Sequence, residues 1–184
     1  MVRFPPAETA RKHQKIVQRA SRLFRKSGFS AVSIGDVMRA AELTHGSFYN
    51  HFESREALLS ECVDHVAGLA VKQIEDAAPT IAGRKQFAAN YLSLNNRDAP
   101  DRGCLLSSLG AEIAREPSVK PSMTRYVRTF VSAIASHFPW NKARARSEAI
   151  RMTASLVGAL LLARAVDDEK LSREILDEVA KQYG

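Results

Sequence analysis

The sequence predicts an all-α protein, and three observations support that class. Glycine and proline are sparse, at 9 and 7 of 184 residues, and they fall at intervals that suit the ends of helices. No run of four residues alternates apolar and polar side chains in the manner of a strand. Apolar residues instead recur three and four positions apart, which is the spacing of one buried helix face.

The first predicted helix covers residues 10–27 and ends before Gly28, because glycine tolerates the positive φ that follows many helices. One of its faces is apolar, with Ile16, Ala20, Leu23 and Phe24 at helical spacing. A basic ridge runs beside that face: Lys15, Arg19, Arg22, Lys26. The ridge is either a solvated surface or a row that approaches a phosphate backbone.

A pair of short helices follows. Ser33 is placed to cap the first of them, and Asp36 three residues later approximates a capping box. Residues 42–44 break the pattern, and Thr44 is placed to cap a short helix over 45–52. Two short helices joined by a tight turn, behind a longer basic helix, match the helix-turn-helix pattern.

Six further helices are expected, which makes about nine in total. Ser54 caps a long helix over 55–77, and the others cover residues 84–96, 103–115, 119–138, 143–166 and 169–182. The helix over 143–166 is apolar on most sides, so it needs burial from several directions. We expect it and its predecessor, through Tyr126, Val127, Phe130, Val131 and Ile134, to form a four-helix interface across a twofold axis.

The positive charge is concentrated in the first part of the chain. The formal net charge is +7, and residues 1–52 hold nine basic and three acidic residues, which is +6 of it. Clustered Lys and Arg are what binding to a phosphate backbone requires, because each contact releases counterions. A basic composition alone indicates only solubility, but its division into a basic module and a nearly neutral body favours nucleic acid.

Several classes are excluded or unsupported. The longest apolar stretch, residues 152–163, is shorter than the roughly 18 residues of a membrane span, and residues 1–6 lead into charged residues without an apolar signal region. Two cysteines, Cys62 and Cys104, make neither a disulfide framework nor a zinc pattern. We therefore expect a cytoplasmic protein with no metal, no cofactor and no membrane partner.

An enzyme is not expected either. Five histidines are present (His13, His45, His51, His65, His137), but no HExxH motif, nucleophile elbow, glycine-rich phosphate loop or paired acids accompany them. We assign no catalytic residue.

The short helix over 45–52 has two different faces. Phe48 and Phe52 lie on one side and are predicted to be buried. The opposite surface is polar, aromatic and small, with His45 at its edge followed by Gly46, Ser47, Tyr49 and Asn50. A purely structural surface helix favours Glu, Lys and Ala, and glycine within it costs about 1 kcal/mol. This surface therefore predicts close approach to DNA, with His, Ser and Asn suited to base edges and Tyr to phosphates.

Residues 24–59 resemble the DNA-binding domain of the tetracycline-repressor (TetR) family. The residues that carry the resemblance are Leu23-Phe24, Gly28-Phe29, Val32-Ser33-Ile34, Asp36-Val37, Ala40-Ala41, Thr44 to Tyr49, His51-Phe52, Ser54-Arg55-Glu56 and Leu58-Leu59. The resemblance implies a DNA-binding domain over residues 1–53 and a helical ligand-binding and dimerisation domain over 54–184. It also implies a homodimer on double-stranded DNA with a palindromic operator, which represses until a small-molecule effector releases it.

Roles follow from the resemblance residue by residue. Ser33 and Thr44 match backbone contacts, and His45, Gly46 and Ser47 match base-facing positions. Tyr49 and His51 match phosphate contacts, and Arg55 stands where the family commonly has Lys. The family usually has Gly at the position of Glu42 and Ala at that of Gly35, so the geometry of the turn and the DNA affinity are left open at Glu42.

The body resembles the family more weakly. Gly103-Cys104-Leu105-Leu106, followed by Gly110-Ala111-Glu112, resembles a branch in which a cysteine at this position is proposed to sense electrophiles. Cys104 is therefore either an effector-sensing thiolate or an inert core residue, and Cys62 is expected in the core. Several side chains are candidates for either a pocket or a core: Phe87, Tyr91, Leu94, Leu105, Leu109, Phe130, Trp140. The alternative function is a helical module that binds nucleic acid or a partner without sequence preference.

Overall fold

The computed structural model describes residues 6–183, and these fold into nine α-helices and one 3-10 helix with no strand. The all-α prediction is confirmed. The N-terminal signal prediction falls largely on residues 1–5, which lie outside the described residues. The helices are α1 (Pro6–Ser27), α2 (Ile34–Ala40), η1 (His45–Asn50), α3 (Arg55–Glu75), α4 (Ile81–Tyr91), α5 (Leu94–Asp98), α6 (Leu105–Ile113), α7 (Lys120–His137), α8 (Ala145–Ala165) and α9 (Glu169–Lys181).

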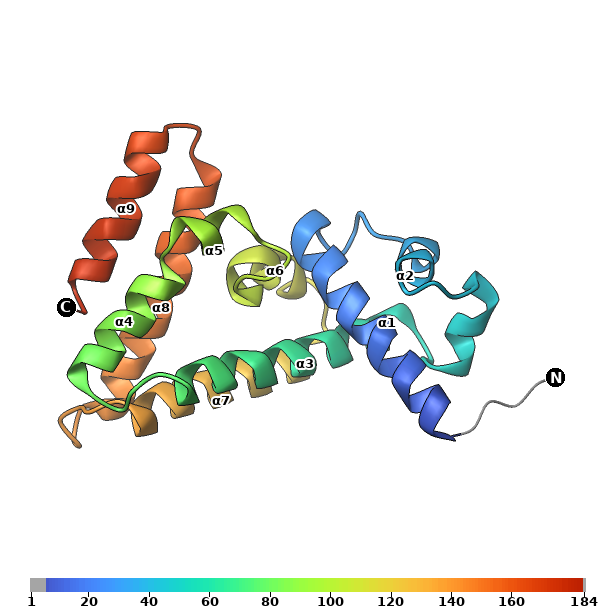
Figure 1. The fold of residues 1–184 in the computed structure, drawn as a ribbon, viewed down its shortest axis with the longest axis horizontal. Coiled ribbons are helices and arrows are strands. Elements are labelled where there is room, and N and C mark those ends of the chain that lie inside the picture. Colours follow the sequence, from blue (N-terminus) through green and yellow to red (C-terminus); the bar gives the residue numbers. More distant parts are fainter. Residues whose placement is uncertain (1–5, 184) are drawn as a thin grey trace.

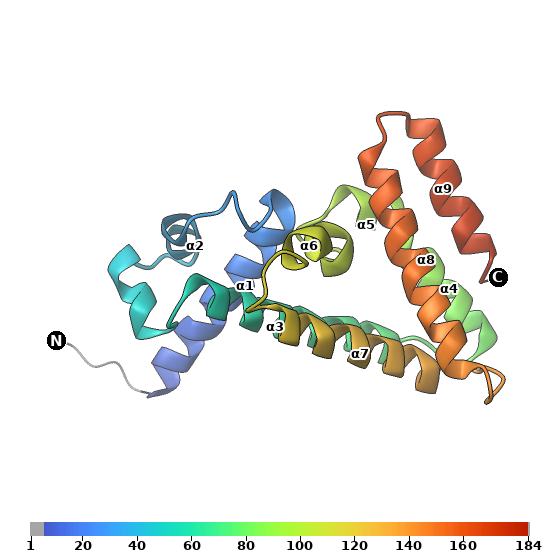
Figure 2. The same cartoon turned by 180° about the vertical axis from the view of Figure 1, so that it is seen from behind.

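Helices α1, α2 and η1 gather at one end of the molecule (Figures 1 and 2). The apolar face of α1 is buried as predicted, with Ile16 and Ala20 fully covered and Phe24 nearly so. Phe48 from η1 is also fully buried in this cluster. Burial of each large apolar side chain contributes about 1.5–3 kcal/mol, so Phe48 anchors a helix too short to be stable alone.

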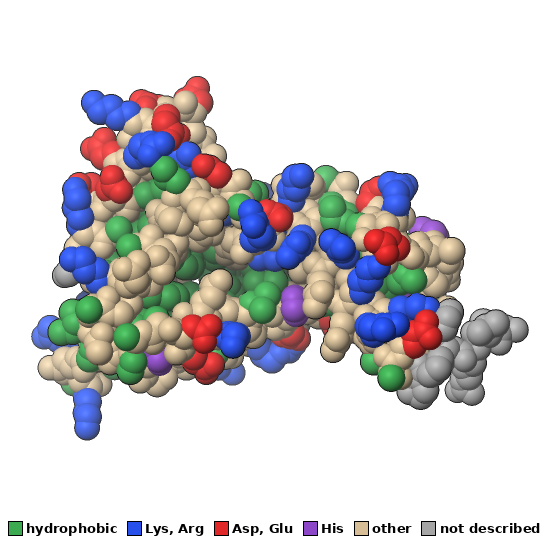
Figure 3. Space-filling model, in the orientation of Figure 1, with side chains coloured by type: hydrophobic (Ala, Val, Ile, Leu, Met, Phe, Trp, Pro, Cys, Tyr) green, Lys and Arg blue, Asp and Glu red, His purple; other side chains and the backbone are tan. Residues whose placement is uncertain are grey.

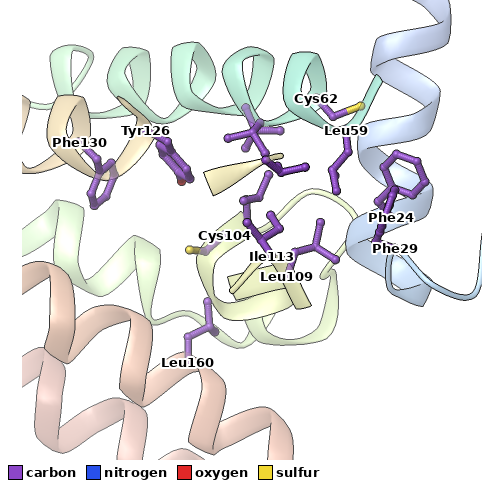
Figure 4. Packing of buried hydrophobic residues seen from close by; sticks show 14 of the residues in the cluster. Phe24, Phe29, Leu59, Cys62, Cys104, Leu109, Ile113, Tyr126, Phe130 and Leu160 are labelled. Atoms are coloured by element: carbon purple, nitrogen blue, oxygen red, sulfur yellow. The ribbon is translucent and has the colours of Figure 1, made fainter. Parts of the chain in front are cut away.

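Helix α3 connects this end to the rest of the chain. It packs against α1 and, along its length, against α7 (Figure 2). Leu59 and Cys62 of α3 face the N-terminal helices, while Tyr126 and Phe130 of α7 face the interior of the body (Figure 4). The domain boundary at 53/54 falls just before α3 and stays a prediction, because α3 shares a core with both parts.

Helix α7 does not present the apolar face that the sequence suggested for a dimer. Tyr126, Phe130, Val131 and Ile134 are at most 5% exposed, and they are covered within one protomer. The outward side of α7 is polar, with Thr124, Arg125, Arg128, Thr129 and Ser132 exposed. The expectation that α7 contributes these residues to a four-helix interface is therefore wrong.

Helix α8 keeps an exposed apolar face. It packs against α7 and α9 through buried residues such as Met152, Leu156 and Leu160. Ile150, Leu161 and Leu162 remain 48–54% exposed on the other side. Within the described residues, no helix is long and apolar enough to cross a bilayer.

The predicted helix over 84–96 is two helices. It starts earlier, at Ile81, because Thr80 caps it by accepting from the Gly83 amide at 3.0 Å. Gly83 is required there, since a Cβ would lie 1.9 Å from the carbonyl oxygen of Ala78. The chain then breaks after Tyr91, and Ser93 caps α5 by accepting from the amide of Asn96 at 3.2 Å. Ser93 is a common capping residue, but the helical spacing of apolar residues continues on both sides of it, so the sequence predicted a single helix.

Candidate DNA interface

Helix α2 is held at its start by the capping box that the sequence predicted. The Ser33 hydroxyl accepts from the Asp36 amide at 3.1 Å, and the Asp36 carboxylate accepts from the Ser33 amide at 3.0 Å. The same carboxylate also accepts a hydrogen bond from Ser33 Oγ at 2.6 Å. These hydrogen bonds, with Arg39 nearby, lower the pKa of Asp36. The exposed Ser33 is thus fixed at the N-terminus of α2, with the Asp36 carboxylate beside it.

The turn after α2 contains a strained residue. Glu42 has φ of 60°, the left-handed region that favours glycine, and it is the non-glycine residue with positive φ among those described. Its exposed carboxylate receives a hydrogen bond from Lys15 Nζ at 2.6 Å. That contact lowers the pKa of Glu42, so the side chain stays ionised at neutral pH. Lys15 of the basic ridge is therefore partly neutralised beside the helix-turn-helix.

The short helix η1 is a 3-10 helix, in which the Thr44 side chain makes no capping hydrogen bond. Thr44 nevertheless occupies the N-cap position that the sequence predicted. The Ser47 amide and hydroxyl donate to the Thr44 carbonyl oxygen at 3.1 and 2.7 Å. The exposed hydroxyl of Thr44 is left facing solvent, where it is available to another partner.

The outward surface of η1 matches the sequence prediction in its exposure. His45, Gly46 and Asn50 are exposed, Ser47 is half-buried, and Tyr49 is 66% exposed although it is a large aromatic residue. A Cβ on Gly46 would meet nothing within 4 Å, so nothing in the protomer requires glycine there. Phe48, on the opposite side, is fully buried and packs edge-to-face against the Tyr49 ring. The buried Phe48 thus fixes η1 so that four polar or small residues lie together on its outer surface: His45, Gly46, Ser47 and Asn50.

His51 lies at the end of η1 against the first helix. Burial is the main cause that lowers its pKa, and His13 and Lys12 add to it, so the imidazole is neutral at pH 7. The His13 ring lies 5.8 Å from that of His51 and stacks on Phe52 at 4.5 Å. As a neutral ring, His51 is suited to one hydrogen bond to a phosphate rather than to an ion pair.

Arg55 is engaged inside the protein. Its Nη2 donates to the carbonyl oxygen of Val32 at 2.7 Å and also to that of Phe29. Its guanidinium lies 3.9 Å from the centre of the Phe29 ring. Arg55 therefore clamps the connection between α1 and α2 to the start of α3, a role that sequence reasoning missed. The sequence showed only that residue 55 is positively charged, and it gave no indication that the guanidinium contacts Phe29 and Val32.

Two side chains of the body also hold the N-terminal helices. Glu112 of α6 accepts from the amide and hydroxyl of Ser30 at 3.0 and 3.2 Å. Arg25 of α1 donates to the carbonyl oxygen of Gly103 at 2.7 Å. Gly28 has φ of 86°, and a Cβ there would lie 2.8 Å from the Glu112 carboxylate. These contacts join α6 to the helix-turn-helix, and no motif in the sequence indicates them.

A large open cleft of about 1360 Å³ lies between α1, α3, α4 and the start of α6. Three residues of the basic ridge, Lys15, Arg19 and Arg22, border this cleft. Phe87, Tyr91 and Phe130 from the predicted pocket set line it too, whereas Leu105 and Leu109 belong to the core at 1% exposure. The ridge thus faces the body at least in part and is not simply a DNA-facing row.

Both cysteines are buried thiols. Cys62 is 1% exposed, and its Sγ donates to the Val17 carbonyl oxygen at 3.5 Å, so its predicted core placement is confirmed. Burial raises its pKa. Cys104 is 8% exposed, occupies the N-cap of α6 and lines the cleft. In the part of the chain that the structure describes, no three His, Cys, Asp or Glu side chains gather to hold a metal ion.

Comparison with known proteins supports this geometry. The family model for bacterial regulatory proteins of the tetR family matches residues 16–62, which cover most of α1, the whole helix-turn-helix and the start of α3. Residues 16–62 therefore carry the sequence pattern of the tetR family. The helix-turn-helix lies entirely within this matched region.

Individual relatives agree. The chain is similar to the HTH-type transcriptional repressor DhaR of Mycobacterium sp. (strain GP1), at 31% identity over 105 residues, which are 55% of this chain and 52% of DhaR. It is also similar to the HTH-type transcriptional regulator AcrR of Shigella flexneri, at 38% identity over 61 residues, which are 33% of this chain and 28% of AcrR. The matched region thus spans about half the length of DhaR and less of AcrR.

Solved structures share the fold of this chain. A TetR-family regulator from Agrobacterium tumefaciens superposes with a TM-score of 0.75 at 19% identity, over 95% of this chain and 98% of that one. The reduced form of E. coli NemR gives a TM-score of 0.71 at 18% identity, over 94% and 95%. These matches extend the likeness through the helical body.

Proposed function

We propose that this protein is a sequence-specific DNA-binding transcriptional regulator, and in particular a homodimeric repressor of a palindromic operator in double-stranded DNA. The observation that carries the proposal is the exposed surface of η1. His45, Gly46, Ser47 and Asn50 stand together there over a buried Phe48. Side chains of this kind read donors and acceptors in the major groove. Thr44, Tyr49 and His51 flank them at positions suited to phosphate.

The names of related proteins point the same way. DhaR is named a transcriptional repressor and AcrR a transcriptional regulator. A repressor needs contacts with the DNA backbone that fix its position and orientation on the operator. The exposed Ser33 at the start of α2 is proposed to contact a phosphate, in addition to the residues of η1.

The homodimer is supported by α8. Its exposed apolar residues Ile150, Leu161 and Leu162 share the outer side with small ones, and Gly158 has open space where a Cβ would stand. Large apolar side chains at about half exposure along one helix mark a surface that another molecule covers. A twofold pairing of α8 buries this face and carries two η1 helices to half-sites about 34 Å apart.

The effector is proposed to act from the cleft. A small molecule that binds one arrangement of the body better than the other shifts the population toward it. Arg25 and Glu112 couple the cleft wall and α6 to the helix-turn-helix, so displacement of α6 re-orients η1. We assign the chain to the branch with the Gly-Cys-Leu-Leu motif, in which Cys104 at the cleft wall is the candidate electrophile target.

Binding to the DNA that flanks the gene tests the regulator proposal. Fluorescence anisotropy should show salt-sensitive binding that discriminates among sequences. Tyr49→Ala should weaken binding to every sequence, whereas His45→Ala should change base preference. Binding that ignores sequence would favour the non-specific nucleic-acid module instead.

Sensing by Cys104 has a separate test. A thermal-shift titration with an electrophile such as N-ethylmaleimide, on the wild type and on Cys104→Ser, compares the two thiols. Cys62, which is fully enclosed, should not respond. An unchanged response in Cys104→Ser would assign Cys104 to the core.

A further inference from the structure

One arginine at the wall of the cleft is buried without a counter-ion. Arg25 is 7% exposed and lines the cleft. Its Nε and Nη1 donate to the carbonyl oxygens of Ser21 and Gly103 at 2.9 and 2.7 Å, and Nη2 donates to no described residue. Asp101 acts on Arg25 electrostatically but makes no ion pair with it. Buried charges are normally paired, so this guanidinium favours an anion beside it.

The neighbouring charges reinforce that preference. Arg22 and Arg102 also line the cleft, are exposed and make no ion pair with any described residue. Asp76 is the one carboxylate among the described lining residues. It ends α3, eleven residues from His65, which is about 16 Å along the helix. Arg22, Arg25 and Arg102 make this end of the cleft positive. Burial, and then the charge of Arg25, lower the pKa of the neighbouring His65.

The remaining wall is apolar with one buried hydroxyl group. Phe87 of α4 and Phe130 of α7 are at most 6% exposed and line the cleft. Figure 4 shows Tyr126, Phe130 and the sulfur of Cys104 pointing toward the same space. The Tyr91 hydroxyl at this wall is buried beside Cys104 and has no hydrogen-bond partner of normal geometry among the described residues. Figure 3 shows the hollow with hydrophobic side chains inside it and Lys and Arg at its edge toward the N-terminal helices.

We propose that this cleft binds an organic anion, a carboxylate or sulfonate on an aromatic or otherwise apolar body. Arg25 Nη2 and the side chain of Arg22 receive the charged group. The apolar body lies against Phe87 and Phe130, within reach of the Tyr91 hydroxyl. The inference rests on the proposed function, because it names the chemical class of the effector. Charge neutralisation at Arg25 would act directly on its bond to Gly103 at the start of α6.

Two fluorescent probes of one ring system test the charge preference. 8-Anilinonaphthalene-1-sulfonate carries a sulfonate, and N-phenyl-1-naphthylamine is the same skeleton without it. Both are titrated into the full-length protein, and each displaces the other in competition. We expect the sulfonate to bind at least about tenfold more tightly, since a charge-assisted hydrogen bond to a buried arginine is strong. Equal affinity, or tighter binding of the neutral probe, would overturn the proposal.

Matched variants locate the charge. Arg22→Gln and Arg25→Gln should each weaken sulfonate binding several-fold and leave the neutral probe unchanged. Arg115→Gln is the control, because Arg115 is an exposed arginine that does not line the cleft. Leu69→Ser, at an exposed cleft residue, should weaken both probes. Circular dichroism checks that Arg25→Gln is folded, and Arg22→Gln, whose side chain is exposed, keeps the test decisive if it is not.

The two proposals fail in different ways. Sulfonate selectivity that is lost in Arg22→Gln, in a protein without sequence-specific DNA binding, would sustain the anion site and refute the regulator. Sequence-specific DNA binding with no selectivity for the sulfonate would sustain the regulator and refute the anion site. Sulfonate binding that Arg22→Gln and Arg25→Gln both leave intact would place the probe elsewhere and also refute the site.

Discussion

Arg55 gives the sharpest test of how the DNA-binding end is held together. Sequence resemblance places it at a phosphate contact, whereas the structure engages its guanidinium with the carbonyl oxygens of Phe29 and Val32 and with the Phe29 ring. The two roles predict different results for Arg55→Ala and Arg55→Lys. A phosphate contact affects DNA binding alone, and the clamp affects the stability of the free protein.

The expected loss can be worked from these contacts. A hydrogen bond from a charged group contributes about 1.5–3 kcal/mol, and a cation–π contact at a partly exposed site about 0.5–1 kcal/mol. Because Arg55 is half-buried, we take the lower value for each of its two hydrogen bonds, so the loss of these bonds alone in Arg55→Ala should cost about 3 kcal/mol. At this chain length that lowers Tm by about 6–12 °C. Arg55→Lys keeps the charge but not the planar fork, so about half of the loss should remain.

Thermal unfolding and DNA titration over a range of salt separate the roles. Arg39→Ala is the control, because Arg39 is an exposed arginine of the same helix-turn-helix. The Tm of the Arg39→Ala variant should differ little from that of the wild type. If Arg55 also touches phosphate, Arg55→Ala lowers the slope of log affinity against log salt by about one. A Tm of Arg55→Ala within about 1 °C of the wild type would refute the clamp.

Four further predictions concern other parts of the molecule. Glu42→Gly should raise Tm, because it releases about 1 kcal/mol of left-handed backbone strain at residue 42. Glu42→Ala keeps a side chain at a positive φ and should not raise Tm, so equal Tm values for the two variants would contradict the strain. Gly46→Ala should leave stability unchanged or slightly higher and weaken operator binding at least about tenfold, since only an approaching partner needs that space; unchanged anisotropy would count against it. The pKa of His65 is lowered in the folded protein, so the unfolded state binds a proton more readily and stability is lost as pH falls below about 6.5. Urea titrations should show a smaller loss of stability between about pH 7.5 and 5.5 for His65→Gln than for the wild type, and equal losses in the two proteins would rule this out. Leu161→Glu should convert a dimer to a monomer in light scattering without unfolding it, because Leu161 is 49% exposed on α8; an unchanged mass would move the interface elsewhere.

Much of the DNA-binding end follows from local sequence. The capping box at Ser33, the stop at Gly28 and the two faces of the short helix each depend on residues within four positions of one another. Interactions at that range are set by backbone geometry, so spacing alone predicts them. The geometry of the turn at Glu42 was left open by the sequence, and the structure gives this residue a positive φ.

Other features required contacts between distant residues. Arg55 meets residues 23 and 26 positions earlier, and Glu112 meets Ser30 from 82 positions away. The spacing of the apolar residues of α7 shows that they are buried, but it does not show which element covers them. They were therefore assigned to a dimer interface. Only packing against α3 shows that they are covered within one protomer.

The sequence by itself determined the all-α class, the helix-turn-helix and the polar surface of its short helix, since these depend on periodicity and on caps a few residues apart. Tertiary structure alone decided that Arg55 serves as a clamp, that α8 rather than α7 keeps an exposed apolar face, and that Arg25 is buried beside an open cleft. The physical reason is that burial and the pairing of charges are properties of neighbours in space, which chain spacing does not encode.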